Sequence, residues 1–175
     1  GVARTFQNIR LFRQMTVIEN VKAAFTKDIS YNLLDATFRT PKYWRTEKAL
    51  TEKAMDLLAI CHLEDKADVL ASSLPYGQQR KLEIARALAT NMKLLLLDEP
   101  AAGMNPTETE DLLNCINTIR DRFGIEVVPH LICGGQSKYD IEDALIDLDF
   151  LGLHNVLALR GDKSQNEKLS LIHIS

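Results

Sequence analysis

The sequence predicts an α/β fold in which short apolar strands alternate with amphipathic helices. The first observation is the aliphatic run at residues 94–97, which is too short for a helix and too apolar for an exposed strand. The second is that two further apolar segments, 125–133 and 156–159, each follow a stretch with helical periodicity. This alternation predicts a parallel sheet in which residues 94–97 form a buried strand.

The composition is that of a globular chain and excludes several classes. The 175 residues are 46% hydrophobic and 26% charged, and no apolar run approaches the ~20 residues of a membrane span. The net charge of -3 argues against a primary nucleic-acid partner. Three cysteines without CxxC spacing argue against a disulfide framework or zinc site and favour a reducing compartment. Residues 1–5 do not resemble a signal peptide and lack an initiating Met, so we expect the chain to begin within a longer protein.

Three helices are predicted before residue 92. Thr16-x-x-Glu19 has the spacing of a capping box, which predicts a helix start. Residues 30–44 are interpreted as a loop or a broken helix, and an amphipathic helix is predicted from Thr46 onward. A third helix follows Gly77.

Two more helix starts follow residue 97. In Asn105-Pro106-x-Glu108, Asn can cap the helix, Pro suits its first position and Glu can reach back to the cap amide. Gly124 lies where that helix should end, in the position that favours glycine. Ser137-x-x-Asp140 predicts the start of the helix between the last two strands.

The residues that point most directly to chemistry are Asp98 and Glu99, which follow the aliphatic run. The carboxyl end of a strand is where α/β sheets bind ligands. One carboxylate there can serve Mg²⁺, while the other activates an attacking water. The alternative is a strand that simply ends in two solvated acids, and an isolated pattern of this kind leaves both interpretations open.

The surrounding motifs resemble those of ABC-transporter ATPases. Residues 74–88 (LPYGQQRKLEIARAL) resemble the signature motif and its helix, and residues 5–8 (TFQN) resemble the Q-loop. Residues 101–106 (AAGMNP) resemble the D-loop that follows the Walker B acids. The order and spacing of these motifs agree with the family over about residues 1–124. The residues within the motifs are most similar to those of ATP-binding subunits of branched-chain amino-acid transporters.

The resemblance implies a role for each matching residue. Gln7 would sense the γ-phosphate, Asp98 would hold Mg²⁺ and Glu99 would be the general base. The remaining positions concern nucleotide binding: Gly77 and Gln78 would open a helix facing the ATP of a partner subunit, and Asn105 would lie in the D-loop. For Asn105, helix capping is a sufficient alternative role.

The resemblance also implies partners and a location. ATP and Mg²⁺ would be the cofactors, and a second ATP-binding subunit would complete a head-to-tail dimer. Transmembrane permease subunits would place the protein at the cytoplasmic face of the inner membrane, as a peripheral component without a nucleic-acid partner. Residues 12–24 lie where the family docks a permease helix, although an ordinary helix of the helical subdomain explains them equally well.

Two departures from the family pattern concern phosphate binding. Pro75 stands where the signature motif usually has Ser, so an amide and a hydroxyl are lost there. None of the eight glycines is followed by Lys, so the sequence contains no Walker A motif. We therefore expect an incomplete ATPase fragment that is inactive alone.

Residues 125–162 instead resemble methylenetetrahydrofolate reductases. The resemblance lies in residues 129–133 (PHLIC), 143–152 (DALIDLDFLG) and 155–162 (NVLALRGD), and implies a strand-helix-strand piece of a (β/α)₈ barrel. His130, Arg160, Gly161 and Asp162 would line FAD from the carboxyl ends of strands. The alternative is a βαβ unit ending in a polar turn, and one such unit cannot close a barrel, so we do not expect FAD binding. His130 is also too early, and has the wrong neighbours, to be the switch histidine of an ABC ATPase.

The expected organisation has four parts. Residues 1–91 form the Q-loop and the helical signature subdomain, and residues 92–124 form the Walker B strand, D-loop and helix. Residues 125–162 form the reductase-type βαβ fragment, and residues 163–175 form a disordered tail whose end resembles a translated sequencing adapter. The expected function is that of a fragment of a branched-chain amino-acid importer ATPase. The alternatives are a reductase fragment or a chimeric product with no physiological function.

Overall fold

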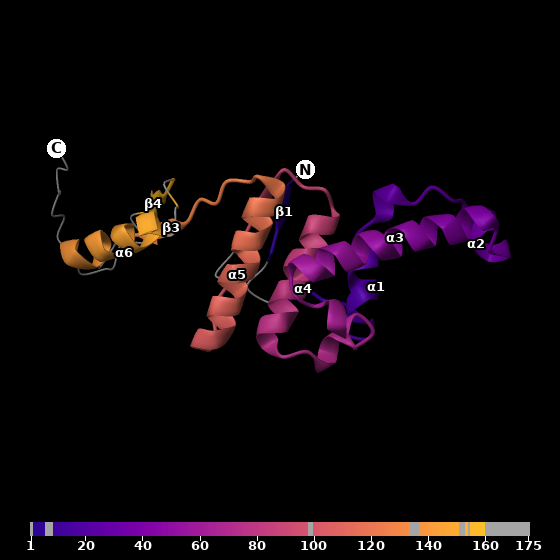
Figure 1. Ribbon diagram of the computed structural model, residues 1–175, viewed down its shortest axis with the longest axis horizontal. Helices are drawn as coiled ribbons and strands as arrows, with labels where there is room; N and C mark the ends of the chain where they lie inside the picture. Colours follow the sequence, from indigo (N-terminus) through magenta and orange to yellow (C-terminus); the bar gives the residue numbers. More distant parts are fainter. Residues whose placement is uncertain are drawn as a thin grey trace, which may run out of the picture. The chain divides into compact units, whose positions relative to one another are not determined.

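The computed structural model describes residues 2–5, 9–97, 100–133, 137–150, 153 and 155–159. They fall into two compact units, Gly1–Phe123 and Gly124–Ser175 (Figure 1). The first unit contains β1 (Val2–Arg4), α1 (Val17–Lys22), η1 (Thr26–Asp28), α2 (Leu33–Phe38), α3 (Pro41–Ile60), η2 (Glu64–Lys66), η3 (Ala71–Ser73), α4 (Tyr76–Ala89), β2 (Leu94–Leu96) and α5 (Pro106–Phe123). The second contains β3 (His130–Ile132), α6 (Lys138–Phe150) and β4 (Leu157–Leu159). Within these residues, no helix combines the length and apolarity needed to cross a bilayer.

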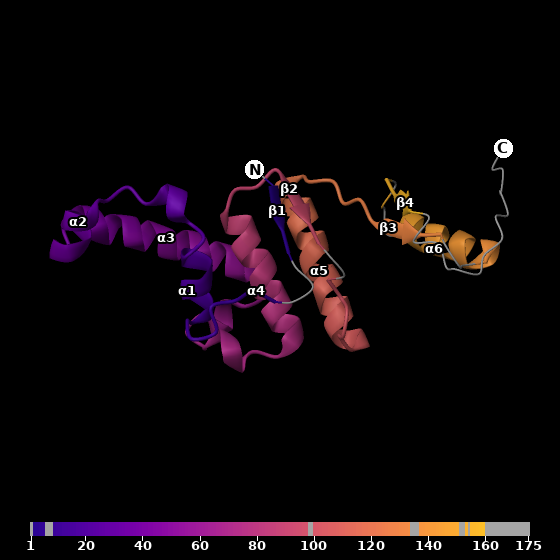
Figure 2. The same cartoon turned by 180° about the vertical axis from the view of Figure 1, so that it is seen from behind.

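The hydrophobic core of the first unit lies between α1, α3, α4 and α5, which pack against one another (Figures 1 and 2). Its buried side chains follow the helical spacing predicted from the sequence, which confirms the amphipathic helices. The largest fully buried apolar residues are Leu58, Leu63, Leu82, Ile84, Leu112, Val17 and Val21.

The helix starts show how local chemistry sets the boundaries. The capping box of Thr16 and Glu19 is formed in both directions, which confirms the predicted start of α1. The segment interpreted as a loop or broken helix is a broken helix: α2 ends at Phe38, and its C-cap residue Arg39 has a left-handed φ of 48°. Thr40 then caps α3, which begins at Pro41 rather than at the predicted Thr46. Proline favours this early start because it suits the first turn of a helix.

The sheet of the first unit consists of β1 and β2 in parallel, with Val2 paired to Leu94 and Arg4 to Leu96. The parallel pairing is confirmed, but the prediction that residues 94–97 form a buried strand is wrong. Leu94 is 51% exposed and Leu96 42% exposed. The physical reason is that, in the part of the chain that the structure describes, β2 pairs with β1 alone, so this small sheet buries only part of the strand.

In the second unit, β3 and β4 form a separate parallel sheet with His130 paired to Leu157. Alternation along the chain predicted one sheet for all three strands, and this prediction is wrong because β2 pairs with β1 instead. The predicted capping of α6 is confirmed: the Ser137 amide donates to the Asp140 carboxylate at 3.0 Å. The hydrogen bonds from Ser137 also lower the pKa of Asp140 below its ordinary value. The bond from the serine hydroxyl contributes most and the bond from its amide less.

Candidate functional site

Three of the predicted site residues follow the two strands of the β1–β2 sheet in sequence, at the carboxyl ends of the strands. The Thr5 amide donates to the Leu96 carbonyl at 2.9 Å, and Thr5 is only 4% exposed. Because β1 and β2 are parallel, the chain leaves both strands at the same edge. Gln7 follows β1, and Asp98 and Glu99 follow β2; these three residues lie outside the described part of the chain. The structure therefore brings together the segments that lead to them.

The first turn of α4 is the second part of the site. Tyr76 is the first residue of the helix, so Gly77 and Gln78 lie in its first turn, and Pro75 at the cap position provides no side-chain hydrogen bond. The Gln78 side-chain oxygen accepts from Lys66 Nζ at 3.0 Å. The positive end of a helix dipole favours an anion, and in this structure the Glu108 carboxylate approaches the Gly77 amide at this end of α4.

Glu108 joins the start of α5 to the start of α4. One carboxylate oxygen, Oε2, accepts from the Asn105 amide at 3.2 Å, while the Glu108 amide donates to Asn105 Oδ1 at 2.9 Å. The other oxygen, Oε1, accepts from the Gly77 amide at 3.4 Å. A Cβ on Gly77 would lie 3.1 to 3.2 Å from the Glu108 side chain, so glycine permits this close approach.

The sequence predicted the helix cap made by Asn105 and Glu108, but not the role of Glu108 at α4. The capping pattern identifies contacts within four residues along the chain, whereas Gly77 and Glu108 are 31 residues apart. No local signal could have revealed this bond, because it exists only once α4 and α5 pack together.

Tyr76 is held at the start of α4 by a buried ion pair one turn further along. Arg80 Nη2 donates to the Tyr76 hydroxyl at 3.1 Å, and its guanidinium lies 5.5 Å from the centre of the tyrosine ring. Arg80 Nη1 also donates to Glu83 at 3.1 Å, and both charged side chains are nearly inaccessible to solvent. These contacts fix the helix end that the resemblance assigns to nucleotide binding.

The segment between β1 and α1 is anchored to two helices, α1 and α4. Asn20 is fully buried; its side-chain oxygen accepts from the Phe12 amide at 2.9 Å, and its amide donates to the Thr16 carbonyl at 2.9 Å. The guanidinium of Arg86 in α4 lies 4.8 Å from the centre of the Phe12 ring and donates to the Arg10 carbonyl. Burial lowers the pKa of Arg86.

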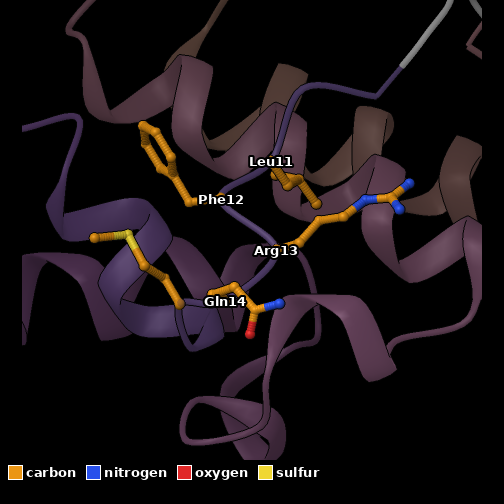
Figure 3. Close-up of a pocket in the computed structure, with 5 residues that line it drawn as sticks. Leu11, Phe12, Arg13 and Gln14 are labelled. Atoms are coloured by element: carbon orange, nitrogen blue, oxygen red, sulfur yellow. The ribbon is translucent and has the colours of Figure 1, made fainter.

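This anchored segment lines an open hollow of about 420 Å³. Figure 3 shows the labelled side chains extending in different directions from one loop. The residues that line the hollow are Leu11, Phe12, Arg13, Gln14 and Met15. Phe12 is 50% exposed, so the hollow presents apolar surface to solvent.

Two thiols are buried in the core of the first unit and are inaccessible to substrates. Cys61 and Cys115 are fully buried and hydrogen-bond to each other. This bond raises the pKa of Cys61 and lowers the pKa of Cys115. Because neither thiol reaches solvent, neither is a candidate nucleophile.

Of the residues predicted to line a flavin, the structure describes only His130. His130 is exposed and is the first residue of β3, although strand-end geometry placed it at a carboxyl end. Its register partner is Leu157, the first residue of β4, so His130 lies at the opposite edge from the chain that continues past Leu159. Arg160, Gly161 and Asp162 lie outside the described residues. Among the described residues there is also no cluster of three metal-ligating side chains.

Comparison with known proteins supports both resemblances. The ABC transporter family model matches residues 1–102, and the methylenetetrahydrofolate reductase model matches residues 89–172. The second match overlaps the first over residues 89–102 and includes much of the predicted tail. The resemblance of the second segment is therefore confirmed at the level of the family model.

Curated relatives match the ABC-like part. The chain is 44% identical over 128 residues to the high-affinity branched-chain amino acid transport ATP-binding protein BraF of Pseudomonas aeruginosa, covering 73% of this chain and 50% of BraF. LivG of Escherichia coli K12, whose name describes the same role, is 41% identical with the same coverage. The chain thus spans about half the length of these relatives.

Solved structures show the same fold over the same part. A nucleotide-free ATP-binding cassette from an ABC transporter superposes with a TM-score of 0.53 at 31% identity, covering 70% of this chain and 47% of that one. Another cassette in its ADP conformation gives 0.53 at 33% identity with the same coverage. With the family model matching more than half of the sequence, the chain belongs to the ABC transporter family.

Proposed function

We propose that this chain is part of an ATP-binding subunit of an ABC importer for branched-chain amino acids. The observation that carries the proposal is the hydrogen bond from Thr5 to Leu96, which aligns the segments leading to Gln7 and to Asp98 and Glu99 at one sheet edge. The named role of BraF and LivG supports the substrate class. In the assembled transporter, the chain lies at the cytoplasmic face of the inner membrane.

The residues present fit one part of an ATP site. Asp98 supplies a carboxylate of the kind that Mg²⁺ prefers, Glu99 orients and deprotonates water, and Gln7 senses the γ-phosphate. The sequence contains no glycine followed by lysine, so it offers no lysine loop for the β- and γ-phosphates. ATP and Mg²⁺ are therefore cofactors that this chain contacts rather than encloses.

The first turn of α4 is the part that acts on a partner. This turn, which contains Gly77 and Gln78, presents the positive end of the helix to the phosphates of ATP held by a second subunit in a head-to-tail dimer, where phosphate would compete with Glu108 for the Gly77 amide. Asn105 and Glu108 hold the start of α5 against this turn. The hollow lined by residues 11–15 is the surface for a permease helix.

A complementation assay tests this function directly. BraF carrying Gln at the position that aligns with Glu99 is loaded with Mg-ATP and mixed with the 175-residue chain, and complex formation is followed by size-exclusion chromatography. We expect a complex that requires ATP and is lost in Gln78→Glu, because a carboxylate in this turn repels phosphate. Ala59→Asp adds the same charge at an exposed position of α3 and should leave the complex intact. A complex that forms equally without ATP would contradict the proposal.

The isolated chain should show no Mg-ATPase activity, because its sequence provides no lysine loop for the phosphates. The measurement is phosphate release by purified protein, with Glu99→Gln as the control. Activity in the unmodified chain that disappears in Glu99→Gln would show a complete catalytic site and overturn this expectation.

A second candidate rests on the reductase family match over residues 89–172. We propose that residues 125–162 are a strand-helix-strand piece of a (β/α)₈ barrel, joined to ABC segments at 1–91 and 92–124. One strand-helix-strand unit cannot close a barrel around FAD, and His130 lies at the amino end of β3. Purified protein should therefore lack flavin absorption. Genomic reads across codons 115–130 would distinguish a natural fusion from a chimeric product.

A further inference from the structure

Helix α2 and the start of α3 expose a cluster of large apolar side chains. Leu33 is 83% exposed, Leu34 66%, Phe38 76% and Trp44 56%. We call Leu33, Leu34, Phe38 and Trp44 the apolar tip. In both ribbon views α2 lies at the end of α3 that is remote from α4 (Figures 1 and 2).

The core of the protein does not need these side chains. The buried residues of α3 are Leu50, Ala54, Leu58 and Ile60, all C-terminal to Trp44, and α2 has no buried residue. Trp44 makes an edge-on contact with Tyr43, whose ring contacts Tyr31, so it is held in place while remaining exposed. An apolar cluster exposed in this way marks an interaction surface rather than a packing requirement.

Basic residues accompany the apolar tip. Residues 32–45 contain Arg39, Lys42 and Arg45 and one acid, Asp35, although the whole chain carries a net charge of -3. Within the described residues, these three cations form no ion pair, and all three are exposed. Asp35 is occupied locally, since it accepts from the Asn32 amide and the Thr40 hydroxyl. The surface that accompanies the apolar tip is therefore positive on an acidic protein.

We infer that the apolar tip, with Arg39, Lys42 and Arg45, inserts into the surface of a bilayer that contains anionic lipids. Exposed Leu, Phe and Trp beside unpaired Lys and Arg is the composition of segments that lie in the membrane interface. The six residues of α2 are too few to span a bilayer, so the tip lies at the headgroup level. Charge complementarity favours anionic lipid over an uncharged protein groove as the occupant.

The tip contains its own reporter, because Trp44 is the only tryptophan of the chain. The full 175-residue protein is titrated with vesicles of phosphatidylcholine and phosphatidylglycerol, or of phosphatidylcholine alone, while tryptophan emission is recorded. We expect a blue shift and protection from iodide quenching with the anionic vesicles, both weakened by salt because the attraction is screened. Equal binding to pure phosphatidylcholine, or no shift with either vesicle, would overturn the proposal.

Variants separate the contributions of charge and apolar surface. Replacing Arg39, Lys42 and Arg45 together with Gln should weaken vesicle binding at least about tenfold, and Leu34→Asn with Phe38→Asn should abolish the blue shift. Leu113→Asn removes an apolar side chain of α5 that is 48% exposed and should bind as the unmodified chain does. Circular dichroism confirms that each variant is folded. A blue shift that grows with protein concentration in the absence of vesicles would identify self-association instead and overturn the assignment to lipid.

This inference does not depend on ATP or on the proposed transport function. Vesicle binding can be measured without nucleotide, so failure of the complementation assay with BraF would leave it untouched.

Discussion

The two units of the molecule differ in how completely they bury their apolar residues. In the unit Gly1–Phe123, helices α1, α3, α4 and α5 enclose a core that includes Leu58, Leu82 and Leu112. In the unit Gly124–Ser175, none of the described side chains is fully buried, and all three residues of β4 are exposed. Sequence patterns predict helices and strands in both units. Tertiary packing therefore stabilises these elements in the first unit but not in the described part of the second.

The difference teaches that family resemblance and self-sufficient packing are separate properties. In the unit Gly1–Phe123 the helices close around a common core, so this unit has a packed interior. A strand-helix-strand unit of a parallel sheet needs further strands and helices on both faces, and the described part of Gly124–Ser175 supplies none. The first unit should therefore account for the stability of the whole chain.

The largest expected effect comes from deleting a core side chain. Leu58→Ala removes a fully buried residue and should lower the free energy of unfolding by about 3 kcal/mol. Leu145→Ala truncates the same residue type in α6, where it is 44% exposed, and should change stability by less than about 0.5 kcal/mol. Urea unfolding followed by circular dichroism measures both. Equal losses would show that the second unit has a core of its own.

The next effect concerns the buried Asn20, which anchors the segment that lines the hollow. Asn20→Ala leaves the Phe12 amide without its partner and should cost about 2 kcal/mol. Asn32→Ala removes a cap of α2 at the surface and should cost about 0.5 to 1 kcal/mol. Thermal unfolding distinguishes them, and a smaller loss at position 20 than at position 32 would contradict the anchoring role.

A smaller effect should appear in the coupling between Gly77 and Glu108. In the unmodified chain, Gly77→Ala should be neutral or destabilising, because its Cβ meets the Glu108 side chain at 3.1 to 3.2 Å. In a Glu108→Ala background the same change should become stabilising by about 0.5 to 1 kcal/mol, as expected for Ala against Gly in a helix. A double-mutant cycle measures the coupling, and strictly additive effects would show that the two helix starts are not joined.

The smallest effect is electrostatic and depends on pH. Glu47 accepts from Lys22 Nζ at 2.7 Å and from the Tyr31 hydroxyl at 2.8 Å; the bond from Lys22 chiefly lowers the pKa of Glu47 below its ordinary 4.5. The stabilisation is therefore present above that ordinary value and is lost as pH falls through the lowered pKa. Glu47→Gln should cost about 0.5 to 1 kcal/mol at neutral pH, and the difference should close in acid. A difference that persists in acid would contradict the ionic origin.

The same network acts in the opposite direction at high pH. The hydrogen bond to Glu47 raises the pKa of Tyr31 from 10.0 to about 12. Stability from this group is complete below 10.0 and is lost as pH rises toward about 12. Ultraviolet titration should show Tyr31 ionising late, and this delay should disappear in Glu47→Gln.

The sequence predicted those features that depend on neighbours along the chain. Capping at Thr16, Asn105 and Ser137 was predictable because a side chain and a nearby amide satisfy each other locally. The three-residue strand β1 was missed, since three residues carry no periodicity and the strand is defined only by its pairing with β2. The exposure of β2 and the contact of Glu108 with Gly77 likewise depend on which distant elements pack together, and no local pattern encodes that.

The central claim is that the first turn of α4 faces nucleotide held by a partner subunit. Amide hydrogen exchange of residues 76–79, measured by mass spectrometry with and without ATP-loaded BraF carrying Gln at the position that aligns with Glu99, tests it most directly. The claim predicts slower exchange in this turn only when ATP and BraF are both present, with residues 130–132 of β3 unchanged. Unchanged exchange in residues 76–79 under all conditions, while a complex forms, would contradict it.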